Sequence, residues 1–362
     1  MEEKIYLALL HTLWFTHNKL HSIFKENQNY KEFYENISDD YLKKFWLKDN
    51  QIKIILERKN KFSLEFIQKN ITQRNVKIIT VFDDDFPEEF HQISSVPFLI
   101  YLRGNLSLSQ KISIVWSRKI SAYWEKIIQN FIPVLWKYFT IVSGWAAGCD
   151  TWAHKISLEN NIQTLSIIGT WIDQDYPVNN KKLYDKIVET WWGIISMFAI
   201  WEIWNPYNFP IRNQLVAAIS VGTFIVEAKQ KSGTLITARL ALELWKEVFA
   251  APGDIFSSQC EWCNILIQNS SAYPAIYPEN ILEQFNIVSS KNIKIWVWNI
   301  TKKSFQDDVE EKIYNLLLVE KLNINQIAQK LGLDVMTLWF KMSMLEISGH
   351  IKKSLSWDYE IQ

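Results

Sequence analysis

The sequence predicts an α/β fold built on a Rossmann-like parallel sheet, with a helical N-terminal domain and a C-terminal winged-helix-like domain. Three observations lead to this prediction. Short apolar, β-rich segments alternate with amphipathic segments of helical length from Lys111 to about Tyr277, apolar residues recur at helical spacing before Gln73, and three amphipathic segments follow Phe305. Alternating strands and helices favour βαβ units with right-handed crossovers.

These features divide the 362 residues into successive domains. Residues 1–95 read as a helical domain with a connector, either an ordinary helical packing domain or a helix-hairpin-helix (SAM-like) unit. Residues 96–280 form the predicted Rossmann-like domain, and residues 281–304 a linker. Residues 305–362 form the winged-helix-like domain, which either binds duplex DNA or, as we slightly favour, mediates protein contacts.

Composition narrows the classes of function. Lys+Arg and Asp+Glu both number 39, so binding to nucleic acid requires a local basic patch. No apolar run reaches the ~18 residues of a membrane-spanning helix, and the first residues are acidic, unlike a secretory signal. Three cysteines do not form a disulfide framework, and the pair Cys260–Cys263 lacks further zinc ligands nearby. We expect a cytoplasmic protein without membrane contact, metal or cofactor.

The composition is unusual in two residue types, with 18 tryptophans and only 10 glycines. A typical chain of this length has about 7% glycine, or about 25 residues, and the two counts together come close to that number. Trp116, Trp171 and the pair Trp191–Trp192 occupy turn positions that favour glycine. We expect that the gene encodes glycine by UGA and that the sequence shows it as tryptophan; the alternative is a protein with genuine aromatic sites.

Six segments are predicted to form the strands of the sheet: residues 112–115, 139–142, 164–168, 193–198, 223–228 and 247–252. Ligands of such folds bind beyond the carboxyl ends of the strands. The first turn there, Trp116-Ser117-Arg118-Lys119, joins a strand to a helix, a geometry in which backbone N–H groups favour phosphate. The dinucleotide fingerprint G-x-G-x-x-G is missing even with glycine at position 116, so no nicotinamide or flavin is expected.

The second turn contains Ser143, Gly144 and Gly148, small residues that let a ligand approach the backbone closely. His154 follows in the next helix without a nucleophile partner, so we expect a buried, hydrogen-bonded histidine rather than a catalytic base.

In the third turn, residues 205–214, Phe209 and Pro210 favour an extended loop, and Arg212 and Asn213 stand beside the helix that follows. Arg212 would form a phosphate clamp with Arg118 if both lie at the same edge of the sheet; the alternative is a solvated arginine. The fourth turn, Lys231-Ser232-Gly233-Thr234, opens a helix soon after a strand and offers another set of N–H groups, unless it is a simple strand–helix turn.

As a set, these segments resemble the DNA-processing protein A (DprA/Smf) family over roughly residues 80–360. The matching segments are GSRK with Trp116 read as glycine, the second turn with its later Ala-His, NFPxRN, SGTLITAR, EVFAAPG and CNILI. The resemblance implies a non-catalytic homodimer that binds single-stranded DNA and delivers it to RecA recombinase in transformation or related recombination. It implies a site lined by Trp116, Ser117, Arg118, Lys119, Ser143, Gly144, Gly148, Arg212, Asn213, Lys231, Ser232, Gly233 and Thr234.

The chain departs from the family pattern at Gln214, where the family usually has arginine, which removes one cation from the site. Two other functions remain open. A phosphoribohydrolase-like enzyme on a related scaffold needs a PGGxGTxxE turn, but the sixth strand here ends Ala-Pro-Gly-Asp-Ile-Phe without that glutamate. The other possible function is that of a sensor module that binds a small nucleotide signal. Nucleotide hydrolysis would indicate the enzyme, and salt-sensitive binding of oligo-dT the DNA-binding protein.

Overall fold

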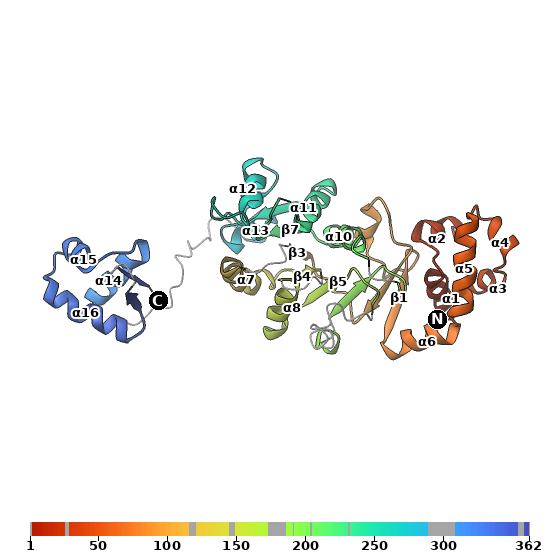
Figure 1. Cartoon of the computed structure of the whole chain (residues 1–362), viewed down its shortest axis with the longest axis horizontal. Coiled ribbons are helices and arrows are strands. Elements are labelled where there is room, and N and C mark those ends of the chain that lie inside the picture. The colour runs from red at the N-terminus through yellow and green to blue at the C-terminus, as the bar shows by residue number, and fades with distance from the viewer. Residues whose placement is uncertain are drawn as a thin grey trace. The chain divides into compact units, whose positions relative to one another are not determined.

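The computed structural model describes residues 2–25, 29–115, 121–144, 149–172, 186–190, 192–202, 205–230, 232–288, 308–353 and 358–361 (Figure 1). The chain divides into two compact units, residues 1–290 and 291–362. The boundaries predicted within and between these units stay predictions.

The first unit is organised around a nine-stranded sheet with the order β1-β2-β6-β5-β4-β3-β7-β8-β9. The strands are β1 (Val76–Thr80), β2 (Leu99–Arg103), β3 (Lys111–Val115), β4 (Thr140–Ser143), β5 (Thr164–Ile167), β6 (Gly193–Ser196), β7 (Gly222–Ile225), β8 (Glu247–Ala250) and β9 (Tyr273–Pro274). All pairs from β6 to β9 are parallel, whereas β1–β2 and β2–β6 are antiparallel. The predicted α/β fold with a parallel sheet is confirmed, and the six predicted strands correspond to β3–β8.

Helices cover both faces of the sheet, as Figure 1 shows. On one face, α7 (Ala122–Leu135), α8 (Cys149–Glu159) and α13 (Pro278–Gln284) share a core with β3, β4 and β7. On the other face lie α10 (Asn208–Ile219), α11 (Gly233–Glu243), α12 (Glu261–Gln268) and the 3-10 helix η1 (Glu88–Gln92). Because α13 includes residues 281–284, a helix occupies the first part of the segment that the sequence predicts as a linker.

The N-terminal helices pack against the antiparallel end of the sheet. They are α1 (Glu2–Thr12), α2 (His17–Ile23), α3 (Tyr30–Glu35), α4 (Asp39–Lys43), α5 (Asp49–Lys61) and α6 (Leu64–Gln73). Two hydrogen bonds attach them to β2 and to the residue before it: His11 Nδ1 lies 3.1 Å from the buried Tyr101 hydroxyl, and the backbone N–H of Phe98 donates to His17 Nδ1 at 3.1 Å. The helical character of residues 1–73 agrees with the sequence pattern, but β1 and β2 were not predicted.

The second unit consists of three helices followed by a two-stranded antiparallel sheet. Its elements are α14 (Asp308–Val319), α15 (Ile324–Leu331), α16 (Val335–Ile347), β10 (Ile351–Lys353) and β11 (Tyr359–Ile361). Ile313, Ile327 and Leu338 bring the three helices into one core. This element order suits the winged-helix-like prediction, which stays a prediction. In the described parts of both units, no helix has the length and apolar character needed to cross a membrane.

Candidate nucleic-acid interface

The connectivity of the sheet creates a binding crevice beside β3. From β3 the chain proceeds through β4 and β5 to β6 on one side, and then returns to β7 on the other side of β3. Such a reversal leaves a crevice beyond the carboxyl ends of the strands, where open α/β sheets bind their ligands. Val115, Ser143 and Ile225 are the last residues of β3, β4 and β7, so the first, second and fourth predicted turns follow strands beside this reversal.

The N-terminus of α11 has the properties of an anion site. Ser232 is the N-cap, and its side chain makes no capping bond to the helix. Its Oγ and the Oγ1 of Thr234 are buried and have no hydrogen-bond partner among the described residues. A Cβ added at Gly233 would meet no atom within 4 Å, so open space lies beside the first residue of the helix. Free N–H groups at a helix start attract phosphate, and two unpaired buried hydroxyls indicate a missing ligand or water.

Arg212 lies within α10, so the prediction that this segment is an extended loop was wrong. Phe209 and Pro210 occupy the first turn of the helix, where proline has no N–H bond to lose. Arg212 is only 4% exposed. Its Nη1 donates to the carbonyl oxygen of Ile167 at the end of β5, and its Nε donates to Asn213 Oδ1 at 3.1 Å. The guanidinium therefore fixes the start of α10 against the carboxyl end of the sheet.

Asn213 links this arginine to the anion site. Its Nδ2 donates to the carbonyl oxygen of Gly233 at 3.5 Å, so the first turns of α10 and α11 lie side by side. The structure thus brings together four predicted site residues, Arg212, Asn213, Ser232 and Gly233, which come from two separate sequence motifs.

Ser143 is the last residue of β4 and Gly144 follows it, and both form hydrogen bonds that connect the end of β4 to neighbouring elements. Ser143 is fully buried, and its hydroxyl donates to the carbonyl oxygen of Ile114 in β3 at 3.0 Å. The carbonyl oxygen of Gly144 is 3.0 Å from His154 Nε2, and His154 Nδ1 is 2.8 Å from Thr164 Oγ1. Burial lowers the pKa of His154 to about 4; the bond to Gly144 opposes this shift, and the positive charge of Arg212 adds to it. His154 is therefore neutral at pH 7, and it is the buried, hydrogen-bonded helix residue that the sequence predicted.

Acid should destabilise the first unit as the pH falls from about 6.5 to about 4. His154 and His17 have pKa values lowered to about 4, chiefly by burial, whereas an unfolded histidine titrates near 6.5. In this window the unfolded chain binds more protons than the folded chain. The free energy of unfolding then decreases by up to about 1.4 kcal/mol per pH unit for each histidine. Above pH 6.5 the histidines are neutral in both states, so the folded protein has its full stability there.

Urea unfolding at several pH values measures this slope. A His154→Gln variant keeps a donor for the Gly144 carbonyl but does not titrate. The pH dependence of its free energy of unfolding should therefore correspond to the uptake of one proton fewer on unfolding. An unchanged slope would contradict the assignment of a neutral, buried His154.

Glu227 is a site residue that the sequence reasoning missed. It lies two residues beyond the end of β7 and is only 2% exposed. Its Oε1 accepts a 2.5 Å hydrogen bond from the hydroxyl of Ser121, which is the N-cap of α7 and also accepts from Trp124 N. Burial raises the pKa of Glu227, while the bond from Ser121 and the charge of Lys229 oppose the shift. The signal was available in the sequence: an acidic residue follows an entirely apolar strand without a break.

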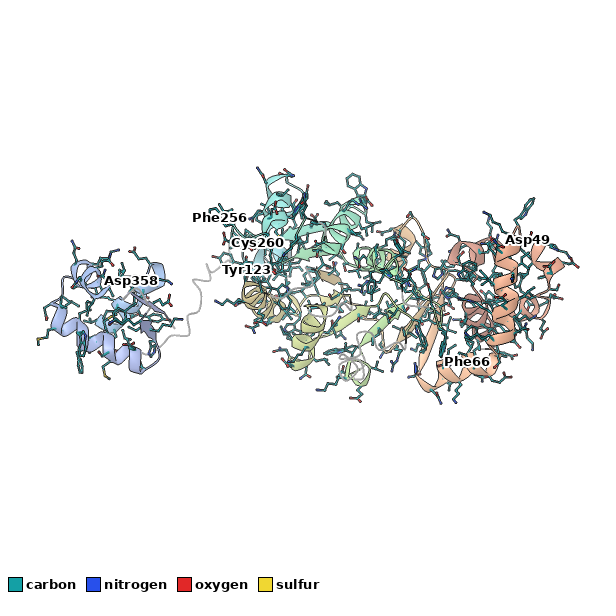
Figure 2. The ribbon with its side chains drawn as sticks, viewed as in Figure 1. Asp49, Phe66, Tyr123, Phe256, Cys260 and Asp358 are labelled. Carbon is teal, nitrogen blue, oxygen red and sulfur yellow. The ribbon has the colours of Figure 1, made fainter. Side chains whose placement is uncertain are left out.

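The Cys260–Cys263 pair lies close to the end of β7. Cys260 is near Tyr123 (Figure 2) and beside Gly253, and Cys263 Sγ is 4.0 Å from the carbonyl oxygen of Ile225. Burial raises the pKa of both thiols, that of Cys263 to about 12, so they are protonated at neutral pH and poor metal ligands. Within the described ranges, no group of three or more His, Cys, Asp or Glu side chains is placed to hold a metal ion.

Six predicted site residues lie outside the described residues: Trp116, Ser117, Arg118, Lys119, Gly148 and Lys231. The expected clamp of Arg118 and Arg212 therefore stays a prediction. The structure does place Val115, the last residue before the first turn, in the strand next to β7.

Comparison with known sequences identifies related proteins. The model of the family "DNA recombination-mediator protein A" matches residues 77–286, more than half of the chain. DNA processing protein DprA of Streptococcus pneumoniae is 36% identical over 194 residues, which is 53% of this chain and 68% of that protein. Protein Smf of Escherichia coli is 30% identical over 293 residues, 78% of this chain and 76% of that protein.

Comparison with solved structures agrees. The X-ray structure of DNA processing protein A from Streptococcus pneumoniae matches with a TM-score of 0.64 and 28% identity, covering 78% of this chain and 97% of that chain. A structure that describes the single-stranded DNA binding mode of DNA processing protein A from Helicobacter pylori matches with a TM-score of 0.52 and 25% identity, covering 58% and 95%. The chain therefore belongs to the DNA recombination-mediator protein A family, as its motifs predicted.

Proposed function

We propose that this protein binds single-stranded DNA in the crevice beside β3 and that it acts in DNA processing as a binder rather than as an enzyme. The observation that supports this most is the start of α11, where open space at Gly233 adjoins the unpaired hydroxyls of Ser232 and Thr234. A phosphate fits this place, because it accepts bonds from N–H and O–H donors alike. The Helicobacter pylori relative, whose structure concerns single-stranded DNA binding, supports a polynucleotide as the ligand.

The charge balance of the chain shapes how this binding responds to salt. With no net charge, the protein attracts DNA only through the cations at the crevice. The proposed cations are Arg118, Lys119, Arg212 and Lys231. Each phosphate that they neutralise contributes about −0.7 to the slope of log K against log salt for a single strand. A few such contacts give a moderate salt dependence, smaller than that of a strongly basic protein.

Titration of labelled oligo-dT with the purified full chain, followed by fluorescence anisotropy at several salt concentrations, tests the proposal. We expect saturable binding that weakens with salt. No binding at low salt would overturn it, and steady hydrolysis of a nucleotide would support the alternative enzyme. The residue after Ala-Pro-Gly beyond β8 is Asp254, which is exposed and begins no glutamate-bearing turn of the phosphoribohydrolase type.

A Gln214→Arg variant should bind single-stranded DNA more tightly than the parent. Gln214 is partly exposed on α10, two residues after Arg212, so an arginine there has access to solvent and adds a cation near the site. A charge-assisted bond to phosphate contributes about 1.5–3 kcal/mol, which predicts roughly a tenfold or greater gain in affinity and a steeper salt slope. The neutral Gln214→Met variant is the matched control, and equal affinities of the two variants would count against a phosphate near α10.

We further propose that the protein forms a homodimer and delivers the bound strand to RecA recombinase; both follow from the family resemblance. A groove between α11 and α12 offers a contact surface for a second copy. Its lining is mainly apolar, with Leu235, Ile236, Ala238, Leu242, Trp262 and Leu266, and also includes Ser232 and Arg239. Sedimentation of the full chain tests the dimer, with a Leu242→Glu variant expected to shift it towards monomer. The rate at which RecA filaments nucleate on single-stranded DNA, with and without this protein, tests delivery.

A further inference from the structure

Four tryptophans have a left-handed backbone conformation. Among the described residues, eight other than glycine have positive φ, and four of these are Trp14 (90°), Trp46 (58°), Trp201 (62°) and Trp245 (56°). The other four are asparagine or serine. Asparagine tolerates this region because its short side chain bonds locally, whereas a bulky side chain there is a true outlier.

Trp14 follows α1 in a turn that ordinarily requires glycine. The N–H of Phe15 donates to the carbonyl oxygen of Leu10 at 3.3 Å, and the N–H of Trp14 donates to that of His11 at 3.1 Å. These two bonds define the Schellman motif, in which the residue after the C-cap is left-handed and usually glycine. Trp14 occupies that residue.

Trp245 occupies the same position after α11. The N–H of Lys246 donates to the carbonyl oxygen of Ala241 at 2.9 Å, and the N–H of Trp245 donates to that of Leu242 at 3.0 Å. A third turn of the same kind in this chain has glycine at the corresponding position. Gly349, after α16, makes the same pair of bonds through its own N–H and that of His350, with φ of 70°.

The indole rings of Trp46 and Trp245 are almost fully exposed, whereas the ring of Trp201 stacks on Trp171 and lies 5.8 Å from that of Phe66. Trp14 is 44% exposed, Trp201 51%, Trp46 92% and Trp245 95%. A left-handed backbone with an ordinary side chain is unfavourable, and glycine removes that cost. Trp171 and Trp192, which the sequence also singled out, do not have positive φ. The backbone argument therefore applies to the four left-handed positions, two of which, Trp14 and Trp245, lie in the Schellman turn.

We propose that the native protein carries glycine at residues 14, 46, 201 and 245, because its gene encodes glycine by UGA at positions that the sequence shows as tryptophan. The scarcity of glycine in the sequence has the same origin. This inference is independent of the proposed function, since none of the four backbone positions is a residue of the candidate interface.

The codons and the mass of a native peptide test the proposal directly. We expect UGA at all four positions, and UGG at any of them would overturn it there. Trypsin cleaves after Arg239 and Lys246, so the protein isolated from its own cells should yield the peptide 240–246. Its mass should correspond to glycine at position 245, and a mass that corresponds to tryptophan would refute the reassignment.

Recombinant variants of the full chain test the backbone argument separately. Trp245→Gly should raise the urea midpoint of unfolding, equivalent to about a fivefold or larger increase in the ratio of folded to unfolded protein. Trp245→Ala removes the same ring but keeps a Cβ, and should give no such gain. Trp136→Gly is the matched control, because Trp136 is 40% exposed with φ of −63° at the end of α7. It should not stabilise; equal gains from all three variants would overturn the argument.

Discussion

Replacing Gly233 with glutamate should abolish most DNA binding while the fold stays intact. A Cβ at this position meets no atom within 4 Å, and Gly233 is not among the residues with positive φ. As the first residue of α11, a glutamate is favourably placed at the positive end of the helix dipole. Its carboxylate would repel the phosphate that we propose to lie there. The loss of charge-assisted bonds, about 1.5–3 kcal/mol, corresponds to roughly a 10- to 100-fold lower affinity.

Anisotropy with labelled oligo-dT measures the affinity, and thermal unfolding measures the stability of the same preparations. Gly233→Gln is the matched control, since it adds the same volume without the charge and should lower affinity less. If the glutamate variant binds like the parent, the phosphate does not lie at the start of α11.

Arg212→Met should lower both stability and affinity. The substitution leaves the buried carbonyl oxygen of Ile167 without its Nη1 partner, which costs about 1–3 kcal/mol of the free energy of unfolding. It also removes a cation beside Asn213 and the start of α11, so DNA binding should weaken further than the loss of folded protein explains. Urea unfolding measures the loss of stability. A DNA titration without urea, under conditions in which the variant is fully folded, measures the loss of affinity separately.

Arg239→Met is the control for this experiment. Arg239 lies on the same helix as Gly233, but its side chain is 71% exposed and pairs only with Glu243 among the partners described, at 3.3 Å. Exposed ion pairs contribute about 0–1 kcal/mol, so this variant should keep its stability and its affinity. A loss of affinity in Arg239→Met equal to that in Arg212→Met would indicate a general charge effect rather than a site at α10.

The parallel core was predictable from the sequence because its strands are buried on both faces. Such strands are mainly apolar and rich in β-branched residues, and those of β3–β8 stand out between amphipathic helices. The strands β1 and β2 were not recognised, since they follow a long helical stretch and flank a connector with two prolines. Their pairing with each other and with β6 depends on contacts across many residues, which a local pattern does not reveal.

The candidate site was predictable as a set of turns but not in its details. The motif SGT correctly indicated the start of α11. Pro210 misled the prediction for α10, because a proline that usually breaks a helix is accepted in its first turn. The bonds of Arg212 to Ile167 and of Asn213 to Gly233 connect residues 45 and 20 positions apart, and only the folded chain shows them.

The antiparallel pair β1–β2 covers the outer edge of β6, the last strand of the parallel part of the sheet. Without it, β6 would be a terminal strand with unpaired N–H and C=O groups, a surface prone to self-association. The region shared with the family begins at residue 77, inside β1, so this protective pair belongs to the common core rather than to the helices before it. Since those helices bury their own apolar faces against the same pair, helices and sheet should melt together as a single cooperative block.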